Sequence, residues 1–293
     1  MGKISLKVKD WVKDHHKIYS LYKKYDFRNL TSPLRTLPDF LIIGGQKCGT
    51  TSLYDFLIHH PGVIPATKKE IFYFSNNYEQ GIHWYSSHFP LLTQKKIQEK
   101  KVKHNVVTGE SSPYYIFHPL AAKRIKNTIP GAKLIVILRN PIDRAYSHYN
   151  FSVYQKREDL TFEDAISKEN ERIEHEKNLN DQREKHEEFH FRYHSYLQRG
   201  HYAEQLERWL QEFTRNQFLI ITTEELKNSQ NKTMNKIFEF LNLPEYDLPT
   251  ISNQNVGNYS RMRQDTRKFL IDYFKPHNKK LYSLLNRNFD WDK

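Results

Sequence analysis

The sequence of 293 residues is 38% hydrophobic and 14% aromatic, enough apolar material for one large α/β domain or two small ones. It has no secretory signal pattern and no run of the roughly 18 apolar residues that a membrane span requires. Its single cysteine, Cys48, excludes an internal disulfide and predicts a cytoplasmic protein. The formal charge of +12 attracts polyanions but does not choose between nucleic acid, anionic membrane, acidic glycan and nucleotide.

Residues 1–37 are predicted to form a basic, amphipathic, helical extension that precedes one larger domain, residues 38–293. Apolar residues recur there at steps of three and four between lysines, which is typical of an amphipathic helix. Such a helix can contact an anionic membrane surface through residues 1–30, but packing of its apolar side on the domain is the favoured interpretation. Pro33 and Pro38 end the helix before the first strand.

From Asp39 onward, short apolar runs alternate with helical patterns. The runs predict strands at 40–43, 106–107, 134–138 and 218–221. The helical patterns lie at 50–60, 119–127, from 141 onward and at 234–241. This alternation predicts a single α/β domain with a parallel sheet covered on both faces, whose site lies at the carboxyl ends of the strands.

Two later segments have a different character. Residues 156–192 are rich in charge and poor in apolar residues, so they are interpreted as a solvated helix or flap with a featureless exposed face. A C-terminal helix is predicted to begin near Gln264 and to be interrupted by Pro276-His277-Asn278.

A strand, a glycine-bearing loop and a helix follow one another in residues 41–53. This order directs backbone N–H groups and the positive end of a helix dipole at one spot, as phosphate binding requires. Gly44 and Gly49 have the spacing of a Walker A loop, but Thr50 occupies the position of its lysine and the lysine is Lys47. The candidate phosphate-binding residues of this loop are Gln46, Lys47, Cys48, Gly49, Thr50, Thr51 and Ser52.

The apolar run at 134–138 ends in Arg139-Asn140-Pro141, without the aspartate that would hold magnesium in a P-loop NTPase. We therefore expect no metal, and we expect Lys47 and Arg139 to neutralise one nucleotide between them. This requires the two side chains to lie on one face of the molecule, near enough for opposite ends of one nucleotide to touch both. Two alternatives stay open, namely a nucleotide kinase or NTPase and a non-catalytic basic protein that binds polyanions.

Two segments resemble known motifs of sulfotransferases that use 3′-phosphoadenosine 5′-phosphosulfate (PAPS). Residues 44–53 resemble their 5′-phosphosulfate loop, and residues 138–149 resemble their 3′-phosphate motif. The branch most similar is the heparan-sulfate type, with its N- and 3-O-sulfotransferases, and related bacterial enzymes. Further segments support that branch: 68–74, 81–85, 109–114 and 199–202.

The resemblance implies a P-loop-like α/β/α fold and sulfuryl transfer to a hydroxyl or amine of a glycan, lipid or small metabolite. It also implies that Arg139 and Ser147 bind the 3′-phosphate and that Glu70 is the general base. Lys47 would stabilise negative charge on the leaving phosphate. The structural alternative for Glu70 is a surface ion pair with Lys68 or Lys69.

The acceptor side departs from the glycan enzymes, which often have histidine at the position of Phe72 and lysine at the position of Ser111. The candidate acceptor-binding residues are Phe72, Phe74, Ser111, Tyr114 and His118. For His118, helix capping or packing is favoured over a role as a spare base. The basic loop of the resembled enzymes near the C-terminus is replaced here by residues 257–262, and we expect Ser260 and Arg261 of this segment to close over the nucleotide.

Overall fold

The structure is a computed structural model that describes residues 27–180, 189–248 and 259–292. The predicted helix at 1–36 therefore lies mostly outside the described residues. A five-stranded parallel sheet has the order β2-β3-β1-β4-β5. Its strands are β1 (Phe40–Gly44), β2 (Val63–Pro65), β3 (Val107–Ser111), β4 (Lys133–Leu138) and β5 (Phe218–Thr222).

Helices and short 3-10 turns make up the remaining elements. In chain order they are η1 (Ser32–Leu34), α2 (Thr50–Leu57), η2 (Tyr78–Gln80), α3 (Gly81–Ser86), α4 (Leu92–Val102), α5 (Ala121–Thr128), α6 (Pro141–Tyr154), α7 (Phe162–Ser167), α8 (Glu169–Asn180), α9 (Phe189–Tyr193), η3 (Gln198–Gly200), α10 (Tyr202–Leu210), η4 (Arg215–Gln217), α11 (Thr223–Asn228), α12 (Gln230–Phe240) and α13 (Gln264–Leu285).

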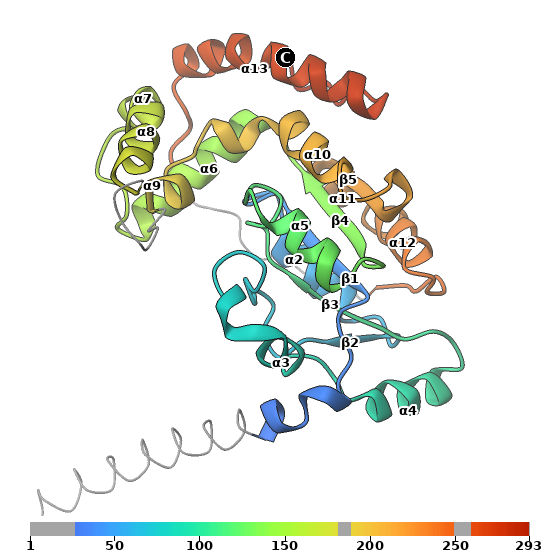
Figure 1. Ribbon diagram of the computed structural model, residues 1–293. Coiled ribbons are helices and arrows are strands. Elements are labelled where there is room, and N and C mark those ends of the chain that lie inside the picture. The colour runs from blue at the N-terminus through green and yellow to red at the C-terminus, as the bar shows by residue number, and fades with distance from the viewer. Residues whose placement is uncertain (1–26, 181–188, 249–258, 293) are drawn as a thin grey trace, which may run out of the picture.

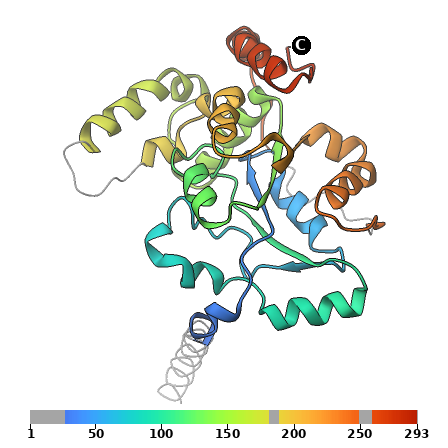
Figure 2. The ribbon, with the colours of Figure 1, turned by 45° about the vertical axis from the view of Figure 1, so that its right-hand side comes forward.

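Helices cover both faces of the sheet (Figures 1 and 2). Alternate residues of the central strands enter two separate cores, one on each face. Leu41 and Ile43 of β1 pack with α5 and α10, whereas Phe40 and Ile42 pack with α2 and α12. A strand buried on both faces reads as a continuous apolar run, which is why β1 and β4 could be predicted. The α/β/α arrangement of layers is confirmed.

Residues 156–192 are more ordered than the sequence suggested. Phe162, Ala165 and Ile166 of α7 are buried, and they pack with Leu270 and Phe274 of α13. Spacing of three and four residues lets this sparse apolar set share one side of a helix. The interpretation of a featureless exposed face is therefore wrong for the described part of this segment.

The predicted break at Pro276 is also wrong. Helix α13 runs without interruption from Gln264 to Leu285 with Pro276 inside it. A proline in a helix loses one backbone hydrogen bond, but here Phe274, Asn278 and Leu281 are buried on both sides of it, so packing holds the helix together. No helix in the described ranges is long and apolar enough to span a membrane.

Candidate functional site

The carboxyl end of β1 leads into the predicted loop, and α2 begins at its far end. Gly49 caps α2 with φ of 95°, a left-handed conformation that favours glycine. A Cβ atom on Gly44 would lie 2.3 Å from the Cγ2 atom of Ile116, so a larger residue has no space there. The backbone N–H of Gly45 donates to the carbonyl oxygen of Ile137 at 2.7 Å, which ties the loop to β4.

Lys47 and Arg139 lie side by side, as the shared-nucleotide prediction requires. The Arg139 guanidinium donates from Nη1 to the backbone oxygen of Lys47 at 3.4 Å. Burial lowers the pKa of Lys47, and the positive charge of Arg139 lowers it further. The Lys47 ammonium lies 4.3 Å from the ring centre of Phe151 on α6, the helix that also carries Ser147.

Two buried arginines that the sequence did not reveal lie behind this loop. Arg144 of α6 has no exposed surface and keeps Nε and Nη1 without a hydrogen-bond partner, and Nε of Arg199 is unpartnered as well. Burial lowers the pKa of Arg199 to about 9, which leaves it positively charged at neutral pH. Within the described residues, Lys47, Arg139, Arg144 and Arg199 form no salt bridge.

The positive charge of these side chains contributes to the low pKa of a neighbouring histidine, His148. His148 is buried, and burial lowers its pKa well below the ordinary value, with further contributions from Arg199, Arg144 and Lys47. Buried charges are normally paired, because leaving them unpaired costs free energy. Unpaired cations with unused donors beside a phosphate-type loop fit a ligand with more than one negative charge.

Arg199 is held directly against the loop. It donates from Nη1 to the side-chain oxygen of Gln46, and its guanidinium lies 4.8 Å from the ring centres of both Tyr114 and Phe117. The segment 199–202 supported the resemblance, yet no role was predicted for Arg199. A lone arginine in a sequence gives no signal that it will be buried.

Glu70 lies next to the loop and is half-buried. Its Oε1 atom lies 3.1 Å from Nζ of Lys69, and its side chain is 35% exposed. The same Lys69 ammonium donates to the hydroxyl oxygen of Thr51 at 2.5 Å, so it bridges Glu70 and the start of α2. Burial and the charge of Arg139 lower the pKa of Lys47, and the charge of Glu70 acts in the opposite direction.

A buried carboxylate that sequence reasoning missed fixes the backbone beside Glu70. Glu110 of β3 accepts hydrogen bonds from Ser112, Tyr115 and Tyr85 at 2.5, 2.8 and 3.0 Å, and from the backbone N–H of Ile71 at 3.2 Å. Burial raises its pKa to about 7, against the effect of these donors. Glu110 therefore positions the segment that carries Glu70.

Among the predicted acceptor residues, Phe72 is partly exposed, whereas Tyr114, Phe74, Ser111 and His118 are buried. Phe72 and Tyr114 lie beneath Arg192, with ring centres 5.7 and 5.8 Å from its guanidinium carbon. Phe74 and Ser111 have no exposed surface, so the prediction that they contact an acceptor is wrong. Phe74 packs inside the aromatic core around Tyr85. Ser111 is the last residue of the buried strand β3.

Three further predicted residues have structural surroundings. His118 is buried, accepts through Nδ1 from the backbone N–H of Leu120 at 3.2 Å and packs with its ring centre 5.5 Å from that of Tyr114, so packing fits and helix capping does not, since α5 has no side-chain cap. Cys48 is buried, and burial raises the pKa of its thiol to about 11, so the thiol is not reactive at neutral pH. Cys48 can therefore contribute only its backbone to phosphate binding. Ser260 is exposed beside α6, where the hydroxyl of Tyr146 donates to its backbone oxygen at 3.0 Å, and Arg261 follows it on the surface.

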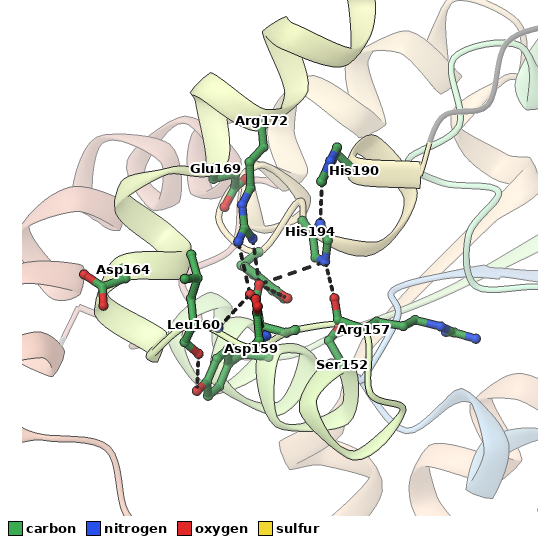
Figure 3. A network of polar contacts seen from close by, with 12 residues as sticks. Ser152, Arg157, Asp159, Leu160, Asp164, Glu169, Arg172, His190 and His194 are labelled. Atoms are coloured by element: carbon green, nitrogen blue, oxygen red, sulfur yellow. Dashed lines mark hydrogen bonds and ion pairs between the residues drawn. The ribbon is translucent and has the colours of Figure 1, made fainter.

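The helical layer beside the loop is fastened by Glu158 (Figure 3). Its fully buried carboxylate accepts two hydrogen bonds from Arg172 of α8 at 2.8 and 3.2 Å, and one from Tyr196 at 2.9 Å. Burial alone would raise the pKa of Glu158, but Arg172 and the other donors lower it overall. His194, which follows α9, lies in the same network, close to Arg157 and His190.

Replacing Glu158 by alanine is expected to lower the free energy of unfolding by about 1.5–3 kcal/mol, because the partly exposed Arg172 and the buried Tyr196 lose hydrogen bonds to a charged group. A lowered carboxylate pKa adds stability above the unfolded value of about 4.3, and this contribution is lost as pH falls through the folded value. The difference from wild type should therefore narrow below about pH 4. Urea unfolding across pH, with the exposed Glu239→Ala variant as control, measures this. A constant difference at every pH would contradict it.

The geometry defines an α/β protein with a phosphate-type loop and a cationic site at the carboxyl ends of β1 and β4. Comparison with known proteins identifies the family to which such a protein belongs. A model of the sulfotransferase domain matches residues 37–275. The crystal structure of a sulfotransferase from Alicyclobacillus acidocaldarius superposes with a TM-score of 0.68 at 30% identity, over 88% of this chain and 100% of that one.

Two curated relatives are similar along most of this chain. The membrane-associated sulfotransferase kil1 of Dictyostelium discoideum is 32% identical, over 88% of this chain and 67% of its own length. The human bifunctional heparan sulfate N-deacetylase/N-sulfotransferase 3 is also 32% identical, over 94% of this chain but only 32% of its own length.

The chain belongs to the sulfotransferase family. It is an enzyme that transfers sulfuryl groups, and the predicted family and fold are confirmed. The kinase and non-catalytic alternatives are set aside with this finding. Within residues 27–180, 189–248 and 259–292, no group of three or more His, Cys, Asp or Glu side chains is arranged to hold a metal ion.

Proposed function

We propose that this enzyme takes its sulfuryl group from PAPS and transfers it to a hydroxyl or amine of a carbohydrate. The observation that carries the donor assignment is the contact between Arg139 and Lys47, with Arg144 and Arg199 behind them, which form no salt bridge in the described residues and keep guanidinium nitrogens without a hydrogen-bond partner. Such a donor, when bound, supplies the sulfuryl group and a good leaving group. The carbohydrate class is supported by the heparan sulfate relative and by the partly exposed side chains of Phe72 and Arg192, which contact each other.

In this proposal each side chain has one task. Arg139 and Ser147 hold the 3′-phosphate, and Lys47 neutralises the charge that develops on the leaving phosphate oxygen. Glu70 accepts the proton of the acceptor hydroxyl or amine. Lys69, which pairs with Glu70 and contacts Thr51, orients the carboxylate relative to the loop. Positive side chains carry out the neutralisation that magnesium provides in P-loop NTPases.

The remaining assignments rest on the same reasoning. We place the catalytic domain at residues 38–293 and treat residues 1–37 as an extension of it. Ser260 and Arg261, near the exposed end of Tyr146, close over the nucleotide in this proposal. Cytoplasmic location stays a prediction from the cysteine content.

The donor site is tested by Arg139→Ala. Because hydrogen bonds to a charged group contribute about 1.5–3 kcal/mol, binding of 3′-phosphoadenosine 5′-phosphate should weaken by about 10- to 100-fold. Isothermal calorimetry measures this, with Arg139→Lys retaining part of the affinity and the exposed Arg215→Ala retaining all of it. Unchanged affinity in Arg139→Ala would remove the 3′-phosphate assignment.

A further inference from the structure

Helix α4 and the segment just before β1 lie together at one end of the molecule (Figures 1 and 2). Both elements expose lysines or large apolar side chains there. We call this surface the basal face. Its residues are Phe27, Leu30, Leu34, Leu92, Lys96, Ile97, Lys100, Lys101 and Lys103.

Helix α4 has an inner and an outer side. Lys95 and Gln98 point inward, where Lys95 bonds both carboxylate oxygens of Asp39 at 2.8 and 2.9 Å and Gln98 donates to the backbone oxygen of Pro61 at 2.9 Å. None of the helix residues is buried. On the outer side Ile97 is 66% exposed, and the lysines of the basal face surround it.

The segment before β1 is fixed against the start of α4. An antiparallel bridge pairs Arg35 with Leu91, and the backbone N–H of Thr36 donates to the oxygen of Pro90 at 3.0 Å. Leu34 and Leu92 each adjoin a residue of this bridge. Leu34 is 62% exposed and Leu30, four residues earlier, is 81% exposed, so apolar side chains continue from one element onto the other.

The charge of this surface is unbalanced. In the described part of the chain, Lys96, Lys100, Lys101 and Lys103 form no salt bridge, and the nearest acid in sequence, Glu99, is half-buried on the inner side. Lysines attract an anionic surface, and exposed leucine and isoleucine gain free energy only where they leave water. A bilayer of anionic phospholipids satisfies both demands, whereas a polyanionic glycan would use the lysines alone.

We infer that the basal face docks on an anionic phospholipid bilayer, with the apolar side chains entering the headgroup region and the lysines contacting lipid phosphates and carboxylates. The face adjoins the amino ends of β1 and β3, because the segment before it enters β1 at Phe40 and α4 precedes β3. The glycine-bearing loop that carries Lys47 lies at the opposite, carboxyl ends of the strands. Docking therefore does not involve Lys47, Glu70 or Arg139, and the inference does not depend on the proposed donor or acceptor.

The experiment is co-sedimentation of the full chain with phosphatidylcholine vesicles that contain or lack phosphatidylserine. The wild-type chain should bind only the phosphatidylserine vesicles. Because each juxtaposed lysine contributes about fivefold, Lys96→Gln/Lys100→Gln should weaken binding by about 25-fold. The matched control is Lys275→Gln/Lys279→Gln, an exposed pair with the same spacing on α13, at the other end of the molecule. Ile97→Ser should weaken binding without changing net charge.

Four results would overturn the inference. Equal vesicle binding by the α4 pair and the α13 pair would exclude a specific face. Full vesicle binding by Ile97→Ser, together with binding of soluble heparin through the same lysines, would assign the face to a polyanionic glycan. Loss of a dimer in Ile97→Ser by sedimentation velocity would assign it to a second copy of the chain. Equal binding to vesicles with and without phosphatidylserine would show that the charge of the lipid does not contribute. Binding of 3′-phosphoadenosine 5′-phosphate, unchanged in every variant, reports that the fold is intact.

Discussion

Lys47→Ala is expected to lower turnover by about 10²- to 10³-fold, the usual loss when one group that stabilises developing negative charge is removed. Lys47 has φ of 67°, a left-handed conformation, but alanine carries the same Cβ atom, so the backbone strain is equal in both proteins. The change therefore tests the ammonium alone. Transfer of radiolabelled sulfate measures turnover, and the exposed Lys275→Ala is the matched control.

The Lys47→Ala change should lower turnover without lowering the stability of the folded protein. Burial, and after it the charge of Arg139, lowers the pKa of Lys47, which has no salt bridge in the described part of the chain, so removing its charge relieves both a desolvation cost and repulsion with Arg139. The melting temperature of Lys47→Ala should equal or exceed that of the wild type. A variant that is both inactive and unstable would mean that Lys47 supports the loop rather than the reaction, and a fully active variant would exclude the catalytic role.

Glu70→Gln is expected to reduce turnover by about 10²- to 10⁴-fold, because glutamine cannot accept the proton of the acceptor. The side chain keeps its size, and the half-exposed pair with Lys69 contributes little to folding, so stability should hardly change. Affinity for 3′-phosphoadenosine 5′-phosphate should also stay, since Glu70 repels rather than binds phosphate. The same sulfate assay and calorimetry measure both quantities, with exposed Glu79→Gln as control.

The ion pair itself needs a separate comparison. Lys69 contacts both Glu70 and Thr51, so loss of the pair could disturb the loop without any proton transfer being involved. Lys69→Ala should therefore lower turnover less than Glu70→Gln does. Equal effects of the two variants, or full activity of Glu70→Gln, would show that Glu70 is not the base.

The sequence predicted the parts of this molecule that depend on neighbours along the chain. The apolar runs at β1 and β4 marked a buried parallel sheet, and the residues that follow those strands meet because β1 and β4 are paired. For that reason the positions of Lys47 and Arg139, each just after a strand, were enough to predict that the two side chains lie together. Strand β2, only three residues long, was too short to carry a pattern.

Burial was the quantity that the sequence did not contain. Arg144 and Arg199 look like ordinary surface arginines, yet both are buried, whereas Phe74 and Ser111 occupy motif positions but have no exposed surface. The charged stretch from 156 folds because Glu158 is satisfied by Arg172 and Tyr196, residues 14 and 38 positions away. Such long-range compensation cannot be read from local composition.

The polarity of the parallel sheet has a consequence for how far an acceptor must reach. A five-residue strand such as β1 spans about 17 Å, so at least that depth of protein separates the basal face from the glycine-bearing loop. An enzyme that rests on lipid through the basal face would hold its candidate active site away from the bilayer, in the aqueous phase. Headgroups of the supporting leaflet would be too short to enter it, while a long saccharide chain or a freely diffusing sugar would arrive unhindered.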